Sequence, residues 1–309
     1  MIKILQGNCL DKLKELPDQS INTCITSPPY WGLRDYDEDK QLGMEDTPEE
    51  FVENLVQVFR EVKRVLRDDG TVWLNLGDSY SSGGRTTTTN QSLRGDKDYG
   101  VTRPKPSKGI KPKDLIGIPW RVAFALQQDG WYLRQDIIWH KPNPMPESVK
   151  DRCTKAHEYI FLLSKSPKYY FDNEAIKEDA KTEPALRNKM GEGYQADYTK
   201  GKRFSDGERV WGSKKRNKRS VWTVTTKPFK GAHFATFPMD LIEPCVLAGC
   251  PENGTVLDPF GGSGTTGIVA SNHNRKAVLI ELNAEYIEIA KQRIQDQGGL
   301  FTDLEILGG

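Results

Sequence analysis

Two short motifs near opposite ends of the sequence hold residue types suited to chemistry on a bound ligand. The first is the Gly-rich segment Asp258-Pro-Phe-Gly-Gly-Ser-Gly-Thr-Thr-Gly, in which Gly262, Gly264 and Gly267 have G-x-G-x-x-G spacing. Such a turn lets the backbone approach a ligand closely, and the helix start that follows offers free N–H groups. Glu281 follows 19 residues after Gly262, where a carboxylate can bind the hydroxyls of a ribose. The pattern predicts a nucleotide-type ligand, and one adenosine with a short tail satisfies it as well as a dinucleotide.

The second motif is the turn Ser27-Pro28-Pro29-Tyr30-Trp31, which follows a short β-branched segment. Prolines donate no N–H group, so their surroundings present carbonyl acceptors beside the small hydroxyl of Ser27. Tyr30 and Trp31 add flat apolar rings. These groups together suit an exocyclic amino group on a planar base, because oxygens accept its protons while a ring stacks on its face. A rigid turn that carries core aromatics is the alternative for this motif taken alone.

Predicted secondary structure places both motifs at strand ends. Apolar β-branched runs predict strands at residues 21–26, 71–76, 133–139, 159–163, 255–258 and 277–281. Helical spacing of apolar side chains predicts helices at residues 47–66, 119–128, 239–248, 265–271 and 284–297. This alternation favours an α/β fold with a mostly parallel sheet and helices on both faces. Ligands of such sheets bind at the carboxyl ends of the strands, where both motifs lie.

Composition argues against several classes of protein. The sequence of 309 residues has no run of about 18 apolar residues, and its N-terminus is too polar for a signal peptide. Its 5 cysteines include no Cys-x-x-Cys pair, and its 4 histidines show no metal-ligand spacing. We therefore expect a cytoplasmic protein with reduced thiols, no membrane association and no bound metal.

The charge distribution indicates a nucleic-acid partner. Although the net charge is only +1, residues 181–230 have 14 basic and 5 acidic side chains, and residues 84–115 have 8 basic and 3 acidic ones. The longer segment interleaves its charges with aromatic rings, which can stack on bases while the cations neutralise phosphates. A solvated loop is the alternative for either charge run alone.

The two motifs, in this order, resemble those of the DNA amino-methyltransferases, which methylate cytosine-N4 or adenine-N6. The segment Thr26-Ser-Pro-Pro-Tyr30 resembles their catalytic motif, and the Gly-rich segment resembles their S-adenosyl-L-methionine motif. A catalytic motif that precedes the cofactor motif, with a basic segment between them, is similar to the β group of this family. Further segments that resemble pocket or cofactor motifs are residues 75–78, 139–144, 157–158 and 233–238.

The resemblance implies a circularly permuted Rossmann-like fold with a seven-stranded, mostly parallel sheet that contains one antiparallel strand. It implies a catalytic half at residues 1–172 with a flexible basic loop at about 84–113, a target-recognition insertion at 173–220 and a cofactor-binding half at 221–309. The implied cofactor is S-adenosyl-L-methionine. Asn8 stands where family members commonly have aspartate near the cofactor adenine, so it departs from the pattern. The implied cofactor-binding residues are Asn8, Phe237, Asp258, Phe260, Gly262, Gly264, Thr265 and Glu281.

For catalysis, the resemblance implies that a base flipped out of double-stranded DNA enters a pocket formed by Ser27, Pro28, Pro29 and Tyr30. Its amine donates to Ser27 and to the Pro28 carbonyl, Tyr30 stacks on the base, and the nitrogen attacks the sulfonium methyl in line without a covalent enzyme intermediate. Serine at the first motif position favours cytosine-N4. Adenine-N6 stays open, although adenine enzymes usually have aspartate there.

The basic insertion implies DNA contacts, and a cognate restriction endonuclease is a candidate partner. Arginines suit guanine edges and phosphates. The candidate DNA-binding residues are Arg203, Arg209, Arg216 and Arg219.

Competing functions explain only parts of the sequence. Carbon-5 cytosine methylation needs a cysteine nucleophile in the catalytic turn, whereas Cys24 precedes the turn and Cys245 lies in an apolar stretch. A nicotinamide-dependent oxidoreductase would explain the Gly-rich turn, but only 42 residues follow Gly267. A non-catalytic DNA-binding protein would explain the basic segments without the paired motifs. An RNA methyltransferase would share both motifs and stays open.

Overall fold

The part of the chain that the structure describes forms two compact units. The structure is a computed structural model, and it describes residues 1–32, 41–81, 110–180, 185–187, 209–211, 215–226, 237–297 and 303–307. The larger unit comprises Met1–Asp172 with Ser220–Gly309, and the smaller unit is Asn173–Arg219. Residues 84–109 of the predicted basic loop lie outside the described residues.

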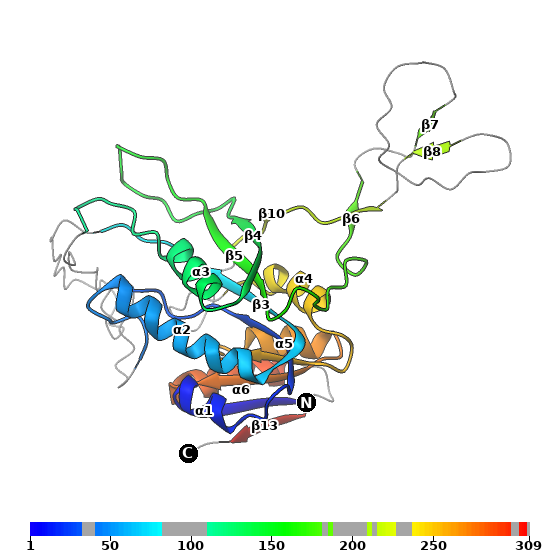
Figure 1. The fold of residues 1–309 in the computed structure, drawn as a ribbon, viewed down its shortest axis with the longest axis horizontal. Coiled ribbons are helices and arrows are strands. Elements are labelled where there is room, and N and C mark those ends of the chain that lie inside the picture. Colours follow the sequence, from blue (N-terminus) through cyan, green and yellow to red (C-terminus); the bar gives the residue numbers. More distant parts are fainter. Residues whose placement is uncertain are drawn as a thin grey trace. The chain divides into compact units, whose positions relative to one another are not determined.

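The larger unit is built on a sheet that has nine strands within the described residues, in the order β10-β4-β5-β3-β2-β11-β12-β1-β13 (Figure 1). The strands are β1 (Ile2–Gln6), β2 (Ile21–Thr26), β3 (Leu66–Leu76), β4 (Tyr132–His140), β5 (His157–Ser164), β10 (Val221–Thr223), β11 (Thr255–Asp258), β12 (Lys276–Glu281) and β13 (Leu304–Leu307). All neighbours are parallel except at β5, which runs antiparallel to β3 and β4. The predicted mostly parallel sheet with one antiparallel strand is therefore confirmed for the seven central strands, and β10 and β13 extend it at the edges.

Helices cover both faces of this sheet. They are α1 (Cys9–Glu15), α2 (Pro48–Val65), α3 (Ile118–Gln128), α4 (Met239–Gly249), α5 (Thr265–Asn272) and α6 (Ala284–Gln297). The helices α1, α2 and α3 pack side by side on one face, and α4, α5 and α6 pack on the other (Figure 1). None of the helices in the described ranges combines the length and hydropathy that a membrane crossing requires.

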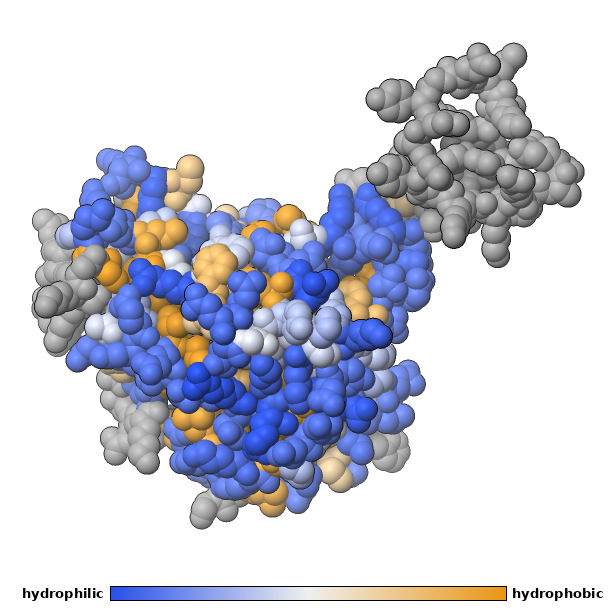
Figure 2. Space-filling view, viewed as in Figure 1, coloured by the Kyte–Doolittle hydropathy of each residue, from blue (hydrophilic) through white to orange (hydrophobic). Residues whose placement is uncertain are grey.

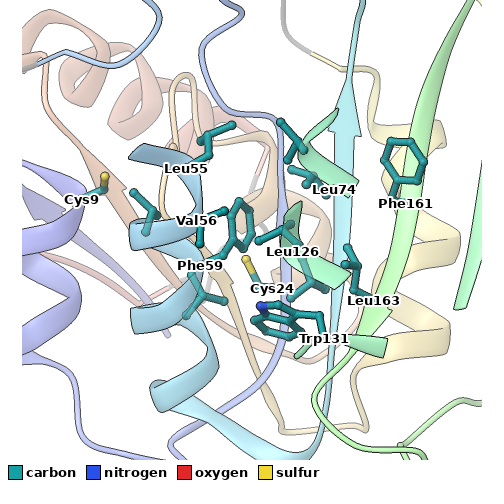
Figure 3. Close-up of a cluster of buried hydrophobic side chains, with 14 of the residues drawn as sticks. Cys9, Cys24, Leu55, Val56, Phe59, Leu74, Leu126, Trp131, Phe161 and Leu163 are labelled. Atoms are coloured by element: carbon teal, nitrogen blue, oxygen red, sulfur yellow. The ribbon is translucent and has the colours of Figure 1, made fainter. Parts of the chain in front are cut away.

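The helix α2 shows how local sequence signals and burial act together. Thr47 caps its N-terminus by accepting a hydrogen bond from the Glu50 N–H at 3.2 Å, and Pro48 follows in the first turn. Its apolar positions recur at helical spacing, so one face of the helix is fully buried. In Figure 3, Leu55 and Phe59 of this face lie against side chains of the neighbouring strands and of α3. Burying each such side chain contributes about 1.5–3 kcal/mol, which holds α2 on the sheet.

The smaller unit contains two short antiparallel strand pairs. β6 (Glu178–Asp179) pairs with β9 (Lys215–Arg216), and β7 (Ala185–Arg187) pairs with β8 (Arg209–Trp211). The sequence predicted only irregular structure here, because two- and three-residue strands carry no visible periodicity. On the one face that Figure 2 shows, the described residues are mainly hydrophilic, with apolar side chains scattered among them.

Candidate active site

The sheet topology brings the two predicted motifs together. β2 and β11 are parallel neighbours, with Thr23 beside Val256 and Cys24 beside Leu257, so their carboxyl ends lie at the same edge. The last residue of β2 touches the last residue of β11, because the Thr26 hydroxyl donates to Asp258 Oδ1 at 2.6 Å. The Ser27–Tyr30 turn and the Gly-rich turn therefore begin from one contact, although they are more than 200 residues apart in the sequence.

The Asp258 carboxylate organises this edge from inside the protein. It is 1% exposed and accepts from three groups, which are the hydroxyls of Thr26 and Thr266, each at 2.6 Å, and the Phe260 N–H at 3.1 Å. Burial raises the pKa of Asp258 from 3.8 to about 6, and the three hydrogen bonds oppose that shift. The carboxylate thus links the end of β2, the Gly-rich turn and helix α5.

The glycines of the Gly-rich turn differ in what surrounds them. Gly264 caps α5 with a φ of 78°, and a Cβ there would lie 3.1 Å from the Cβ of Ala290 in α6. A Cβ at Gly267 would lie 3.0 Å from a methyl of Leu279 in β12. Gly262 has a φ of 49°, but a Cβ there would meet no protein atom closer than 3.9 Å. Gly264 and Gly267 therefore allow close packing, whereas Gly262 borders open space that a ligand can approach.

Glu281 closes the other side of the Gly-rich turn. Its two carboxylate oxygens accept from the backbone N–H groups of Gly262 at 2.8 Å and Asn283 at 2.9 Å. Burial raises the pKa of Glu281, and these backbone bonds oppose that shift. Each carboxylate oxygen can accept more than one hydrogen bond. Glu281 can therefore hold the turn and also accept from the hydroxyls of a ribose, so the donor and acceptor set fits an adenosine-bearing cofactor.

Two further candidate cofactor-binding residues, Asn8 and Thr265, already use their side chains in hydrogen bonds within the protein. Gly7, directly after β1, donates its N–H to the Glu281 carbonyl at 2.9 Å, and the next residue, Asn8, caps α1 because its Oδ1 accepts from the Leu10 N–H at 3.0 Å. The Thr265 hydroxyl is buried and accepts from Arg293 of α6 at 3.1 Å, and its backbone N–H lies in the first turn of α5, where it can donate to a ligand.

Two aromatic cofactor candidates complete the set. Phe260 lies in the Gly-rich turn and packs partly against the core. Phe237 is half-buried just before α4, and residues 233–236 of its motif lie outside the described residues.

The catalytic turn contains a hydrogen-bonded network that the sequence did not predict. The Tyr30 hydroxyl donates to Glu158 Oε2 at 2.8 Å, and Asn75 Oδ1 lies 3.4 Å from the same hydroxyl. Glu158 also accepts from Asn75 Nδ2 at 3.3 Å and forms an ion pair with Lys141 through its other oxygen. Burial, followed by the charge of Glu158, raises the pKa of Tyr30. Tyr30 is therefore a fixed, neutral ring.

Backbone packing also fixes the orientation of the Tyr30 ring. A Cβ at Gly77 would lie 2.6 Å from the ring atom Cε2, so only glycine leaves room for the ring at this position. Resemblance had singled out residues 75–78, 139–144 and 157–158 as pocket segments. It assigned no role to Asn75, Lys141 or Glu158, whose convergence depends on the antiparallel strand β5.

The candidate DNA-binding arginines are described unequally. Arg216 and Arg219 both donate to Glu178 Oε1, at 2.9 and 2.7 Å. Arg209 is described only in its backbone within β8, and Arg203 lies outside the described residues. One carboxylate therefore partly neutralises the two arginines whose side chains are described.

No alternative chemistry is assembled in the described part of the chain. Cys24 and Cys245 are both fully buried, and burial raises the pKa of the Cys24 thiol well above its ordinary value. All five cysteines lie within the described residues, and none of them forms a disulfide bond. The described residues contain no group of three or more side chains placed to hold a metal ion.

Comparisons with known proteins agree with this geometry. Residues 21–292 match the family N6_N4_Mtase, described as DNA methylase. The chain is 49% identical to the type II methyltransferase M.Cfr9I of Citrobacter freundii, over 95% of this chain and 88% of that protein. It is 50% identical to the type II methyltransferase M.SmaI of Serratia marcescens, over 94% of this chain and 90% of that protein.

Solved structures show the same fold. The TTHA0409 protein of Thermus thermophilus, crystallised with S-adenosyl-L-methionine, has a TM-score of 0.63 and 21% identity, covering 100% of this chain and 99% of that one. The cytosine-N4-specific PvuII DNA methyltransferase has a TM-score of 0.63 and 19% identity, covering 98% of this chain and 94% of that one.

Proposed function

Because the chain belongs to the N6/N4 family of DNA methylases and is an S-adenosyl-L-methionine-dependent type II DNA methyltransferase, we propose that it methylates the N4 amine of cytosine. The observation that carries the choice of base is Ser27, a hydroxyl and not a carboxylate, as the first residue of the catalytic turn. The turn leaves the carboxyl end of β2 directly beside the Gly-rich turn. A base held by the first turn would therefore face a cofactor held by the second.

The roles of the pocket residues follow from their chemistry. A base inside a duplex cannot reach such a pocket, so we infer that the target cytosine is flipped out of double-stranded DNA. Ser27 Oγ and the Pro28 carbonyl would accept the two amine protons, which favours a tetrahedral nitrogen whose lone pair is no longer delocalised into the ring. The Tyr30 ring, held by Gly77 and Glu158, would stack on the base.

The cofactor side of the site holds and orients the methyl donor. When bound, S-adenosyl-L-methionine supplies a methyl group on a sulfonium centre. Glu281 would accept from the ribose hydroxyls, and the open side of Gly262 would let the backbone approach the cofactor. Asn8, Phe237, Phe260 and the N–H groups at the start of α5 would complete the contacts. The catalytic help comes mainly from positioning two reactants, which can contribute several kcal/mol.

We assign target recognition to residues 173–220, which include the smaller unit. Its Arg216 and Arg219, together with Arg203 and Arg209, are the proposed contacts to guanine edges or phosphates. A restriction endonuclease that reads the same DNA sequence is the proposed functional partner, because relatives such as M.SmaI are type II methyltransferases.

The decisive experiment identifies the methylated nucleoside. The protein is incubated with unmethylated DNA and S-adenosyl-L-methionine, the DNA is digested to nucleosides, and the products are identified by mass spectrometry. We expect N4-methylcytosine from the wild type and its loss in Ser27→Ala, with cofactor binding retained in that variant. N6-methyladenine would overturn the choice of base. Wild-type turnover in Ser27→Ala would overturn the role of the turn.

A further inference from the structure

One strongly exposed apolar side chain lies in a loop at the edge of the sheet that holds the catalytic turn. The loop, residues 141–156, connects β4 to β5, whose last paired residues are His140 and His157. Its Met145 is 85% exposed, the highest value among the exposed large apolar side chains in the described part of the chain. Isolated exposed apolar residues are common on protein surfaces, so exposure alone assigns no role. The role follows from the position, the rigidity and the charge of the loop.

The loop begins beside the catalytic pocket. β4 runs in the same direction as β3, because both are antiparallel to β5, and β3 is parallel to β2, so the loop leaves the sheet at the edge where the catalytic turn lies. Lys141, its first residue, is ion-paired with Glu158, which accepts from the Tyr30 hydroxyl at 2.8 Å. Consecutive Cα atoms are about 3.8 Å apart, so Met145 lies within about 15 Å of Lys141. A DNA duplex that delivers a base to this pocket is therefore within reach of Met145.

Internal contacts hold the loop in one shape. Both carboxylate oxygens of Glu147 accept from the Arg152 guanidinium, at 2.7 and 3.0 Å. Asn143 exchanges two hydrogen bonds with the backbone of Thr226, at 3.1 and 3.0 Å. The residues on either side of Met145 are both prolines, which restrict the backbone there. The loop therefore presents Met145 on a fixed support and does not fold it against the protein.

The charge of the loop suits a polyanionic partner. The loop contains four basic and two acidic side chains. Of the two acids, Glu147 is ion-paired with Arg152 of the loop itself, and Asp151 is ion-paired at 2.6 Å with Lys113. Lys150 is exposed. The loop can therefore approach the phosphates of a duplex with a favourable electrostatic interaction.

Base flipping creates a gap in the duplex that a side chain such as Met145 can fill. When the target base leaves the duplex, the adjacent bases lose a stacking neighbour and the partner base loses its pair. Proteins that distort DNA insert apolar side chains, methionine among them, between bases. Methionine is unbranched and flexible, and its sulfur is polarisable, so it packs well against flat rings.

We propose that Met145 enters the DNA duplex at the position that the flipped base has left, and that it thereby stabilises the flipped state. This inference rests on the proposed function, because it requires a target base that leaves the duplex. It gives the loop 141–156 a role separate from reading the DNA sequence, which we assign to residues 173–220. In this role Met145 touches neither the reacting amine nor the cofactor.

Three variants and two DNA substrates test this role. Met145→Ala removes the inserted side chain, and Met145→Leu keeps an apolar side chain of similar size. Leu307→Ala is the matched control, because it also shortens an exposed apolar side chain, in this case 45% exposed in β13 at the far end of the strand order. Both substrates carry the site that the wild type methylates. One is fully paired, and in the other the target cytosine faces an abasic position, so no pair has to break and no partner base is left behind.

The measurement is kcat/KM for methyl transfer to each duplex. We expect Met145→Ala to lower kcat/KM by at least about tenfold on the paired duplex and by less than about threefold on the abasic one, because flipping costs less there. Met145→Leu and Leu307→Ala should stay within about twofold of the wild type on both duplexes. The affinity for S-adenosyl-L-methionine, measured by calorimetry, should be the same in all three variants.

The ratio of kcat/KM between the two duplexes decides the outcome. This ratio does not depend on the fraction of active protein, so it remains valid if a variant folds incompletely. A ratio for Met145→Ala that equals the wild-type ratio would overturn the proposal, since the side chain would then act independently of flipping. A change in oligomeric state in Met145→Ala, measured by sedimentation, would also overturn it, by showing that Met145 is a contact between copies of the chain.

The wild-type product tests the proposed function separately. If the wild type forms no N4-methylcytosine, the proposed function fails. If the wild type forms it and Met145→Ala distinguishes the two duplexes only as the wild type does, only the role of Met145 fails.

Discussion

Replacing Asp258 by asparagine should change how the stability of the protein depends on pH. Asp258 is almost fully buried, and burial raises its pKa from 3.8 to about 6. Between these values the folded protein holds a proton on Asp258 that the unfolded chain has lost. The free energy of unfolding must therefore fall as the pH rises from about 4 to about 6, because an increasing fraction of folded molecules has to bury a charge.

The size of this effect follows from the two pKa values. A difference of one pH unit corresponds to about 1.4 kcal/mol, so Asp258 should make the protein less stable at pH 7 than at pH 4 by up to about 3 kcal/mol. Asparagine is neutral at every pH and fits the same donors. Its oxygen can accept from Thr26 and from the Phe260 N–H, and its nitrogen can donate to the Thr266 oxygen.

The assay is urea unfolding of the cofactor-free protein at several pH values between 4 and 7, followed by tryptophan fluorescence. The quantity of interest is the free energy of unfolding of Asp258→Asn minus that of the wild type. This difference should rise with pH by up to about 3 kcal/mol. Asp46→Asn, at an exposed position, is the control for removing one negative charge and should show a nearly constant difference. A constant difference for Asp258→Asn, or one that falls as the pH rises, would refute the reasoning.

Further predictions concern the Gly-rich turn and the arginines of the smaller unit. Gly264→Ala should lower the free energy of unfolding by about 1–3 kcal/mol, because its Cβ would crowd Ala290 of α6 in addition to the strain of a positive φ. Gly262→Ala shares the positive φ but has no such neighbour, so it should lose less stability and mainly weaken binding of S-adenosyl-L-methionine, measured by calorimetry. Equal loss of stability in both variants would contradict this distinction. Arg219→Ala should weaken DNA binding and leave the affinity for the cofactor unchanged. The slope of log affinity for DNA against log salt concentration should become shallower by about one. Glu178→Gln should strengthen DNA binding at low salt, since Glu178 neutralises Arg216 and Arg219, and weaker binding would show that the pairing itself is required.

Many helices and strands could be predicted from the sequence, because their apolar side chains recur at regular spacing and are buried in the fold. The helix α2 was predicted from the cap at Thr47 and one apolar face, and the strand β11 and helix α6 have the predicted bounds. The helix α1 was missed because seven residues with two buried side chains give too short a pattern. β3 was predicted to begin at residue 71, but it begins at Leu66, because Leu66 pairs with Ile21 of β2 ahead of a shift in register.

The candidate site also has one part that the sequence predicts and another part that only the structure shows. The turn after β2 and the turn after β11 have distinctive residues in consecutive positions, so the sequence is sufficient to find them. The network around Tyr30 has no such pattern, because Asn75, Lys141 and Glu158 come from three different strand ends. β5 pairs antiparallel with both β3 and β4, which places its first residues beside the last residues of those strands. Only the strand pairing reveals that Glu158 reaches the catalytic turn.

The contact between Thr26 and Asp258 joins the starting points of two turns that are distant in the sequence and that we propose to hold the methyl acceptor and the methyl donor. Each is the last residue of its strand, and the parallel pairing of Thr23 with Val256 and of Cys24 with Leu257 sets the register of the two strands. A slip of one residue would turn each following side chain to the opposite face of the sheet, so the register that buries Cys24 and Leu257 also fixes the origin of both turns. The smaller unit, Asn173–Arg219, takes no part in this strand pairing. The target recognition that we propose for the smaller unit can therefore vary without a change in the register of β2 and β11.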